Sequence, residues 1–156
     1  MSEKRRNRGF SLLELVVAVV IIGIIAAIAI PRLSRGSAGA ADAALAGNLA
    51  VLRNAVDLYS AEHGGDFPAV ADIDTALLQY SDALGNISAT KDATHIYGPY
   101  IRRIPPLPVG ARKGEIGIAA ADGNTVGWIY NASSGAIRAN TTDTEVDSSD
   151  KKYSDY

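Results

Sequence analysis

The sequence predicts an α+β protein in which a long N-terminal helix packs on a small antiparallel β-sheet head. Three observations predict this fold class. Residues 10–31 form an apolar run, residues 32–63 carry apolar side chains at helical spacing, and short β-type segments separated by turns follow residue 110. The 156 residues suffice for one small domain, and the absence of cysteine excludes disulfides and thiol chemistry.

The first nine residues are polar and basic, so we interpret residues 1–9 as a leader peptide. They contain four Lys or Arg residues and one Glu, whereas the whole chain has 15 basic and 17 acidic residues. The remainder is therefore mildly acidic. Basic residues beside an apolar segment mark the cytoplasmic side of a membrane helix. The folded part shows no basic patch, and we expect no nucleic-acid binding.

The apolar run at residues 10–31 has the length of a membrane helix. As a helix, residues 10–30 would span about 32 Å, close to the roughly 30 Å thickness of a bilayer's hydrocarbon core. Glu14 is the one charged residue within this span. Pro31 lacks a main-chain donor, and we expect it to bend or loosen the helix.

The pattern becomes one-sided in residues 32–63, which we predict to be the amphipathic half of the same helix. The apolar stripe recurs at spacings of three and four, with polar residues such as Asp42 and Arg53 off it. Its members are Ala41, Leu45, Leu49, Leu52, Val56 and Tyr59. We expect this stripe to pack on the head and the helix to end near His63, before Gly64-Gly65.

Residues 64–140 are predicted to form the globular head. A short helix capped by Asp72 is expected to run to Gly85-Asn86, and the four prolines within residues 97–110 predict an irregular loop. The predicted strands are Glu115–Ala119, Thr125–Tyr130 and Ala136–Asn140. Residues 141–156 are polar and acidic, and we expect a loose tail.

The head carries little chemistry. It has no serine-nucleophile elbow or phosphate-binding loop, and its two histidines, His63 and His95, lie far apart in the sequence. We therefore predict no enzymatic activity and no cofactor. Weak candidates for calcium ligands are Asp143, Glu145, Asp147 and Asp150. The glycine and distal glutamate of a calcium-binding hand are missing there, so we predict a solvated tail without metal.

The segment Gly9-Phe10-Ser11-Leu12-Leu13-Glu14-Leu15, followed by Val16–Ile30 and Pro31, resembles the class III signal of type IV pilins and of type II secretion pseudopilins. The resemblance implies cleavage between Gly9 and Phe10 by a prepilin peptidase and N-methylation of Phe10. It implies a pilin-like fold, with residues 10–31 crossing the bacterial inner membrane and later lying in the core of a periplasmic or cell-surface fibre. Pro31 resembles the family's helix-kinking proline, which implies a part in assembly.

The resemblance also implies partners and a location. The partners are copies of the chain, other pilin-like subunits, the prepilin peptidase and methyltransferase, the lipid bilayer, and an inner-membrane platform with its assembly ATPase. The N-terminus would be cytoplasmic and the head periplasmic. A charge inside a membrane costs on the order of 3 kcal/mol unless it has a partner. The amine of Phe10 freed by cleavage is such a partner for Glu14 of another subunit, and this pairing would set the axial register.

Three alternatives remain open at this stage. Instead of pairing with the Phe10 amine of another subunit, Glu14 would reach water at the membrane surface or pair with the Phe10 amine of its own chain. The fibre would be a true pilus or the pseudopilus of type II secretion. Many true pilins have a C-terminal cysteine pair, and its absence here keeps the pseudopilus open as an alternative. A secreted binding protein or hydrolase with an ordinary signal peptide fits the small residues at Ala27-Ile28-Ala29, but Glu14 inside the apolar run argues against it.

Overall fold

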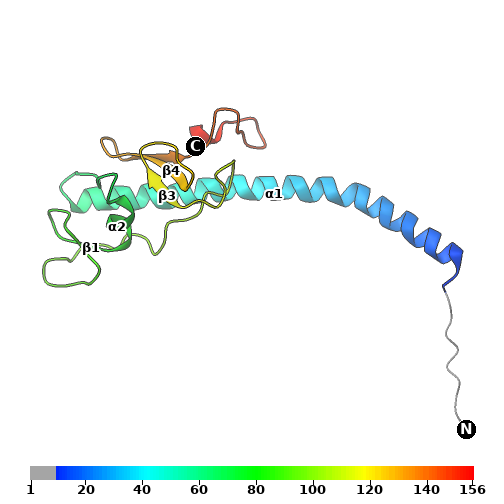
Figure 1. Ribbon diagram of the computed structural model, residues 1–156, viewed down its shortest axis with the longest axis horizontal. Coiled ribbons are helices and arrows are strands. Elements are labelled where there is room, and N and C mark those ends of the chain that lie inside the picture. Colours follow the sequence, from blue (N-terminus) through cyan, green and yellow to red (C-terminus); the bar gives the residue numbers. More distant parts are fainter. Residues whose placement is uncertain (1–9) are drawn as a thin grey trace, which may run out of the picture. The chain divides into compact units, whose positions relative to one another are not determined.

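In this computed structural model, the structure describes residues 10–156, those at positions 30–35 by their main chain alone. The predicted leader lies outside the described residues. The chain divides into two compact units, Met1–Ser37 and Ala38–Tyr156. Helix α1, Leu12–Glu62, belongs to both units (Figure 1). The long N-terminal helix and the small sheets of the second unit confirm the predicted α+β class.

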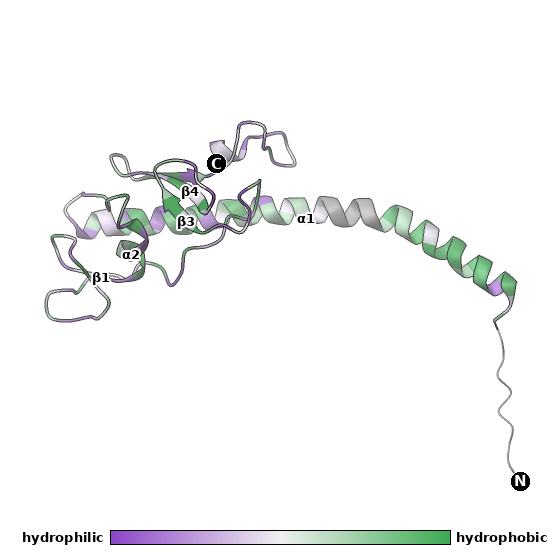
Figure 2. Ribbon diagram, viewed as in Figure 1, coloured by the Kyte–Doolittle hydropathy of each residue, from purple (hydrophilic) through white to green (hydrophobic). Residues whose placement is uncertain are grey.

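The described part of the first unit is apolar helix without a core of its own. Residues Leu12–Ala29 have a mean hydropathy of 3.0, and none of them is buried. Figure 2 shows this hydrophobic character along the first turns of α1. Within the described part of the chain, this segment is long and apolar enough to cross a membrane. The helix continues through Pro31, whose side chain lies outside the described residues, so its role in assembly stays a prediction.

Helix α1 ends at Glu62, one residue before the predicted end. Gly64 and Gly65 adopt φ angles of 70° and 100°, a left-handed backbone that glycine reaches without steric cost. The N–H of Gly65 turns back to donate to the carbonyl of Ser60 at 2.8 Å. The glycine pair therefore terminates the helix as the sequence predicts.

The amphipathic stripe forms one side of the core in the second unit, as predicted. Its four central side chains are essentially inaccessible to solvent: Leu45, Leu49, Leu52 and Val56. They belong to one cluster with buried residues of the head, namely Ile73, Leu77, Trp128, Tyr130 and Ile137. Burying an aliphatic side chain of this size stabilises a fold by about 2 kcal/mol. The second half of α1 is thus an integral part of the head's core.

The short helix of the head is shorter than predicted. Helix α2 spans Ile73–Leu78, and Asp72 stands at its N-cap without making a side-chain cap bond. The chain then becomes extended and forms a two-stranded antiparallel ribbon of β1, Tyr80–Ser81, and β2, Ile87–Ser88. Gly85-Asn86 therefore belongs to the turn between these strands, which the prediction had assigned to the helix end.

A three-stranded sheet has the order β3-β4-β5, with β3 at Gly117–Ala119, β4 at Val126–Asn131 and β5 at Ala136–Ala139. Strands β4 and β5 are antiparallel, as predicted, but β3 and β4 are parallel. The parallel pair depends on glycines at two close approaches. A Cβ at Gly117 would collide with the main-chain oxygen of Thr125, and one at Gly127 would collide with that of Glu115.

The prediction of a loose C-terminal tail is wrong. The hydroxyl of Tyr153 donates to Asp42 Oδ1 at 2.9 Å, and the N–H of Ser148 donates to Asp42 Oδ2 at 3.2 Å. Arg53 donates to the main-chain oxygen of Tyr156 at 2.5 Å. A 3-10 helix, η1 at Tyr153–Asp155, packs near β5. Asp42, which lies off the apolar stripe, is consequently buried and binds the C-terminal segment to α1.

Candidate assembly site at the helix N-terminus

Two predicted site residues line the same hollow: Glu14 in the first turn of α1 and Phe10 just before the helix. Residues at positions i, i+3, i+4, i+7, i+8 and i+11 share one side of a helix. Here they line an open hollow of about 420 Å³: Phe10, Leu13, Glu14, Val17, Ala18 and Ile21. Ala18, one turn after Glu14, is the smallest of the six. The only charged group of this face therefore stands among apolar side chains that no other part of the described chain covers.

Glu14 has a local partner that the sequence analysis missed. The main-chain N–H of Ser11 donates to Glu14 Oε2 at 2.9 Å, and the N–H of Leu13 donates to Ser11 Oγ at 3.3 Å. This reciprocal arrangement is a capping box, in which two side chains satisfy donors of the first helical turn. The pattern Ser-Leu-Leu-Glu at residues 11–14, near the start of the apolar run, is the sequence signal that indicates it.

The capping box leaves Glu14 able to bind a second donor. Its Oε1 makes no hydrogen bond within residues 10–156, and the residue is exposed. A carboxylate oxygen accepts more than one hydrogen bond, so an amine can approach while the Ser11 contact persists. Phe10, which precedes the helix, has 84% of its surface exposed. Gly9, the other half of the predicted cleavage site, lies outside the described residues.

The weak calcium candidates do not converge. Burial raises the pKa of Glu145, but hydrogen bonds from the N–H groups of Thr142 and Ala111 outweigh this and hold the pKa below its usual range. The Tyr156 hydroxyl lowers the pKa of Asp147, together with N–H donors from its own turn. No group of three metal-ligating side chains occurs among residues 10–156. Protein donors therefore already occupy these two carboxylates.

The pair His63 and Ser81 is the arrangement in the head that comes nearest to a catalytic dyad. Ser81 Oγ lies 3.0 Å from His63 Nε2, while His63 Nδ1 faces the carbonyl of Tyr59 at 2.7 Å. A nucleophile must meet its substrate, but Ser81 is completely buried and His63 stacks on the Tyr59 ring. This hydrogen-bonded pair joins the end of α1 to β1. The other histidine, His95, has its Nδ1 at 2.8 Å from Asp92 Oδ2 on the surface.

One family comparison bears on this site. Residues 4–30 match the family model described as the prokaryotic N-terminal methylation motif. The matched segment covers Gly9, Phe10 and Glu14, and it extends almost to Pro31. The chain therefore carries a type IV pilin-like class III signal peptide at its N-terminus. No curated protein and no solved structure matches the chain.

Proposed function

We propose that the chain is the precursor of a structural subunit of a type IV pilus-like or type II secretion pseudopilus fibre. The observation that carries the proposal is the methylation motif on a membrane-length helical segment, Leu12–Ala29, in which no residue is buried, in a chain whose second unit has its own core. The prepilin peptidase cleaves after Gly9 and Phe10 becomes the N-methylated first residue. The subunit contributes structure to the fibre and no catalysis.

The uncovered helix explains why the subunit passes from membrane to fibre. An apolar helix of this length is stable in a bilayer but not in water. The bilayer thus holds the processed subunit in the inner membrane, with its head in the periplasm. Neighbouring helices replace the lipid when subunits stack. Extraction exposes apolar surface transiently, and the platform proteins and ATPase of the assembly system drive it.

The outer face of α1 in the second unit supports helix stacking beyond the membrane segment. Val51 and Leu58 are large apolar residues that remain about half exposed on the side away from the buried stripe. Gly47 and Ala43 precede them on the same exposed surface. Small side chains let helices approach closely. This face supplies a continuous surface on which the helices of neighbouring copies pack.

Glu14 sets the stagger between copies in this proposal. Its free carboxylate oxygen accepts the Phe10 amine of a neighbouring subunit, because both charges are then neutralised in an apolar environment. The capping box offers a competing explanation for the same side chain. Glutamine at position 14 still accepts the Ser11 N–H but carries no charge, so it separates the two explanations.

Fibre assembly by three variants tests this role. Glu14→Gln and Glu14→Ala should both abolish fibres while the processed subunit accumulates in the membrane. Ser11→Ala, which removes the hydroxyl cap alone, should assemble at close to the normal level. Quantitative blotting of sheared fibres against total protein provides the measurement. Normal assembly by Glu14→Gln would show that Glu14 acts only as a helix cap and that its charge is not needed for assembly.

A pilus and a secretion pseudopilus differ in what deletion of the subunit removes. Loss of long surface fibres in electron micrographs identifies a true pilus, whereas loss of exported enzymes identifies the pseudopilus. One observation favours the secretion pseudopilus. The chain has no cysteine for a C-terminal disulfide, and hydrogen bonds to Asp42 and Arg53 hold its C-terminal segment instead.

A further inference from the structure

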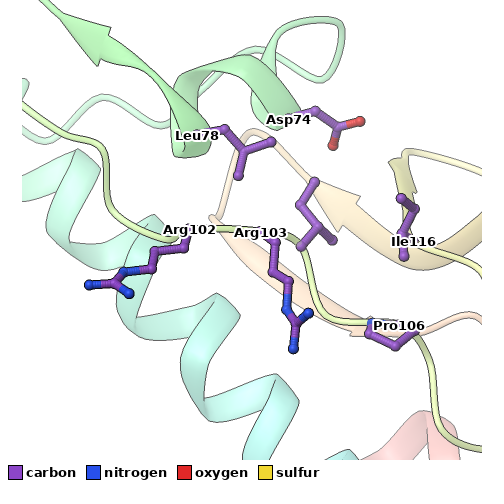
Figure 3. Close-up of a pocket in the computed structure, with 7 residues that line it drawn as sticks. Asp74, Leu78, Arg102, Arg103, Pro106 and Ile116 are labelled. Atoms are coloured by element: carbon purple, nitrogen blue, oxygen red, sulfur yellow. The ribbon is translucent and has the colours of Figure 1, made fainter.

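A pocket of about 540 Å³ lies beside the β3 edge of the head. Its floor is apolar and comes from Leu78 at the end of α2, from Ile104 and Pro106 in the proline-rich loop, and from Ile116 just before β3. In the view of Figure 3, Leu78 and Ile116 both lie above the loop segment that carries Arg102 and Arg103. Ile116 is 54% exposed, which leaves a large apolar side chain uncovered at the mouth.

Charged groups without partners surround this floor. Arg102 and Arg103 are exposed, and neither makes a hydrogen bond or ion pair within residues 10–156. Asp74 lines the opposite wall, and its Oδ1 is buried without a hydrogen-bond partner among the described residues. Burial raises the pKa of Asp74 for this reason. The pocket therefore suits an occupant with an apolar centre, acidic groups toward the arginines and a donor toward Asp74.

The C-terminal segment of the chain has this composition. Residues 141–156 contain five acidic and two basic side chains. Val146 is 38% exposed between the exposed carboxylates of Asp143 and Asp150. Asp150 has a φ of 63°, at the tip of the turn that the Val146–Lys152 bridge closes. Lys151 and Lys152 follow directly and carry several N–H donors each; one contact of Lys152 is with Asp143 at 3.3 Å, and Lys151 lies over the Tyr156 ring.

The pocket and this segment lie at opposite edges of the same sheet. Helix α2, which contributes to the pocket, contacts β3 at one edge, and η1 in the C-terminal segment contacts β5 at the other. A contact between two different patches on identical copies is heterologous, so it repeats from copy to copy and builds an open filament. The geometry of one head thus provides both halves of a propagating contact.

We propose that the pocket beside β3 receives the acidic turn at residues 143–152 of a neighbouring copy of this chain. Val146 packs on Ile116, and the turn's carboxylates pair with Arg102 and Arg103. This inference rests on the proposed fibre-subunit function, because it describes how heads join once the helices stack. It adds a second specific contact, outside the helix core, that fixes the rotation of each head relative to the next.

Disulfide trapping in assembled fibres tests the contact directly, since the chain has no cysteine of its own. A disulfide requires Cα atoms within about 7 Å, so a bond between heads forms only where residue 116 of one copy meets residue 146 of the next, and a bond within one head leaves a monomer. The variant Ile116→Cys/Val146→Cys should therefore give a ladder of dimers, trimers and longer oligomers on a non-reducing gel of oxidised fibres. The matched pair Ile116→Cys/Leu84→Cys, with another exposed apolar residue, should give monomers.

Reversing the charges on the two sides of the proposed contact provides a second test. Arg102→Glu/Arg103→Glu should lower fibre yield about tenfold or more, because like charges facing each other across an interface disfavour it strongly. Adding Asp143→Lys/Asp150→Lys to the same chain should restore the yield. Lys91→Glu, at an exposed residue in another loop, should have no effect.

The outcomes separate the inference from the function on which it rests. Wild-type fibres without an Ile116–Val146 ladder, or reversal without rescue, overturn the head contact and leave the fibre-subunit function standing. A wild-type chain that forms no fibre in the cell that produces it overturns both. A ladder in the Leu84 pair as strong as that in the Val146 pair also contradicts the proposed contact.

Discussion

The packing of α1 on the head predicts a large difference between two identical substitutions on the same helix. Leu52 is completely buried, whereas Leu58, less than two turns later, is 50% exposed. In a chain lacking residues 1–34, which removes the apolar membrane segment and keeps the whole second unit, we expect a soluble folded monomer. Leu52→Ala should destabilise it by about 3 kcal/mol, from lost burial and the cavity left behind. Leu58→Ala should stay within about 0.5 kcal/mol.

The difference should be plain in a thermal melt. For a domain of roughly 100–150 residues, 1 kcal/mol moves the Tm by about 3–6 °C, so Leu52→Ala should lower it by about 10–15 °C. Trp128, the single tryptophan, is fully buried and reports unfolding through its fluorescence. Leu52→Asp adds a buried unpaired charge and should lower the Tm further or prevent folding.

The refuting result is equally specific. If Leu52→Ala leaves the midpoint unchanged, the stripe does not pack on its own head and instead faces neighbouring helices in the fibre. Equal shifts for Leu52→Ala and Leu58→Ala would contradict the assignment of buried and exposed faces.

Three further predictions concern the head. Gly127→Ala should destabilise it by more than about 2 kcal/mol in urea unfolding, because a Cβ collides with a main-chain oxygen, whereas Gly47→Ala in the exposed helix should stabilise it by about 0.5–1 kcal/mol. Burial and the bond to Asp42 raise the pKa of Tyr153 to about 12 from 10.0. The stabilisation that protonated Tyr153 gives the fold is complete below pH 10 and is lost as the pH rises toward 12. The Tm of Tyr153→Phe should therefore fall less than that of the wild type between these two pH values. Because protein donors already occupy Glu145, calcium or a chelator should leave the Tm unchanged, and a calcium-dependent rise would contradict this.

Local patterns in the sequence predicted the helix well. The stripe through Leu45 and Leu52 follows the 3.6-residue period, and Gly64-Gly65 marks the helix end, since both signals depend on neighbouring residues. The Ser11–Glu14 capping box is equally local, and its four-residue pattern indicates it, but it was not among the sequence-based predictions.

Contacts between distant residues were not predictable in this way. Asp42 and Tyr153 are 111 positions apart, and the acidic composition of the C-terminal segment favoured a solvated tail. The parallel pairing of β3 with β4 depends on close main-chain approaches at Gly117 and Gly127, which no local propensity indicates. The pocket near Ile116 likewise needs three separate segments to meet.

The mature N-terminus tests the central claim most directly. The first Lys or Arg after Phe10 is Arg32, so trypsin should release a single N-terminal peptide covering residues 10–32. Mass spectrometry of protein from the membrane and from sheared fibres should show this peptide beginning at Phe10 and heavier by one methyl group. A mature chain that begins at Ile30, as after an ordinary signal peptide, or that retains residues 1–9 would contradict the proposed processing and the fibre function built on it.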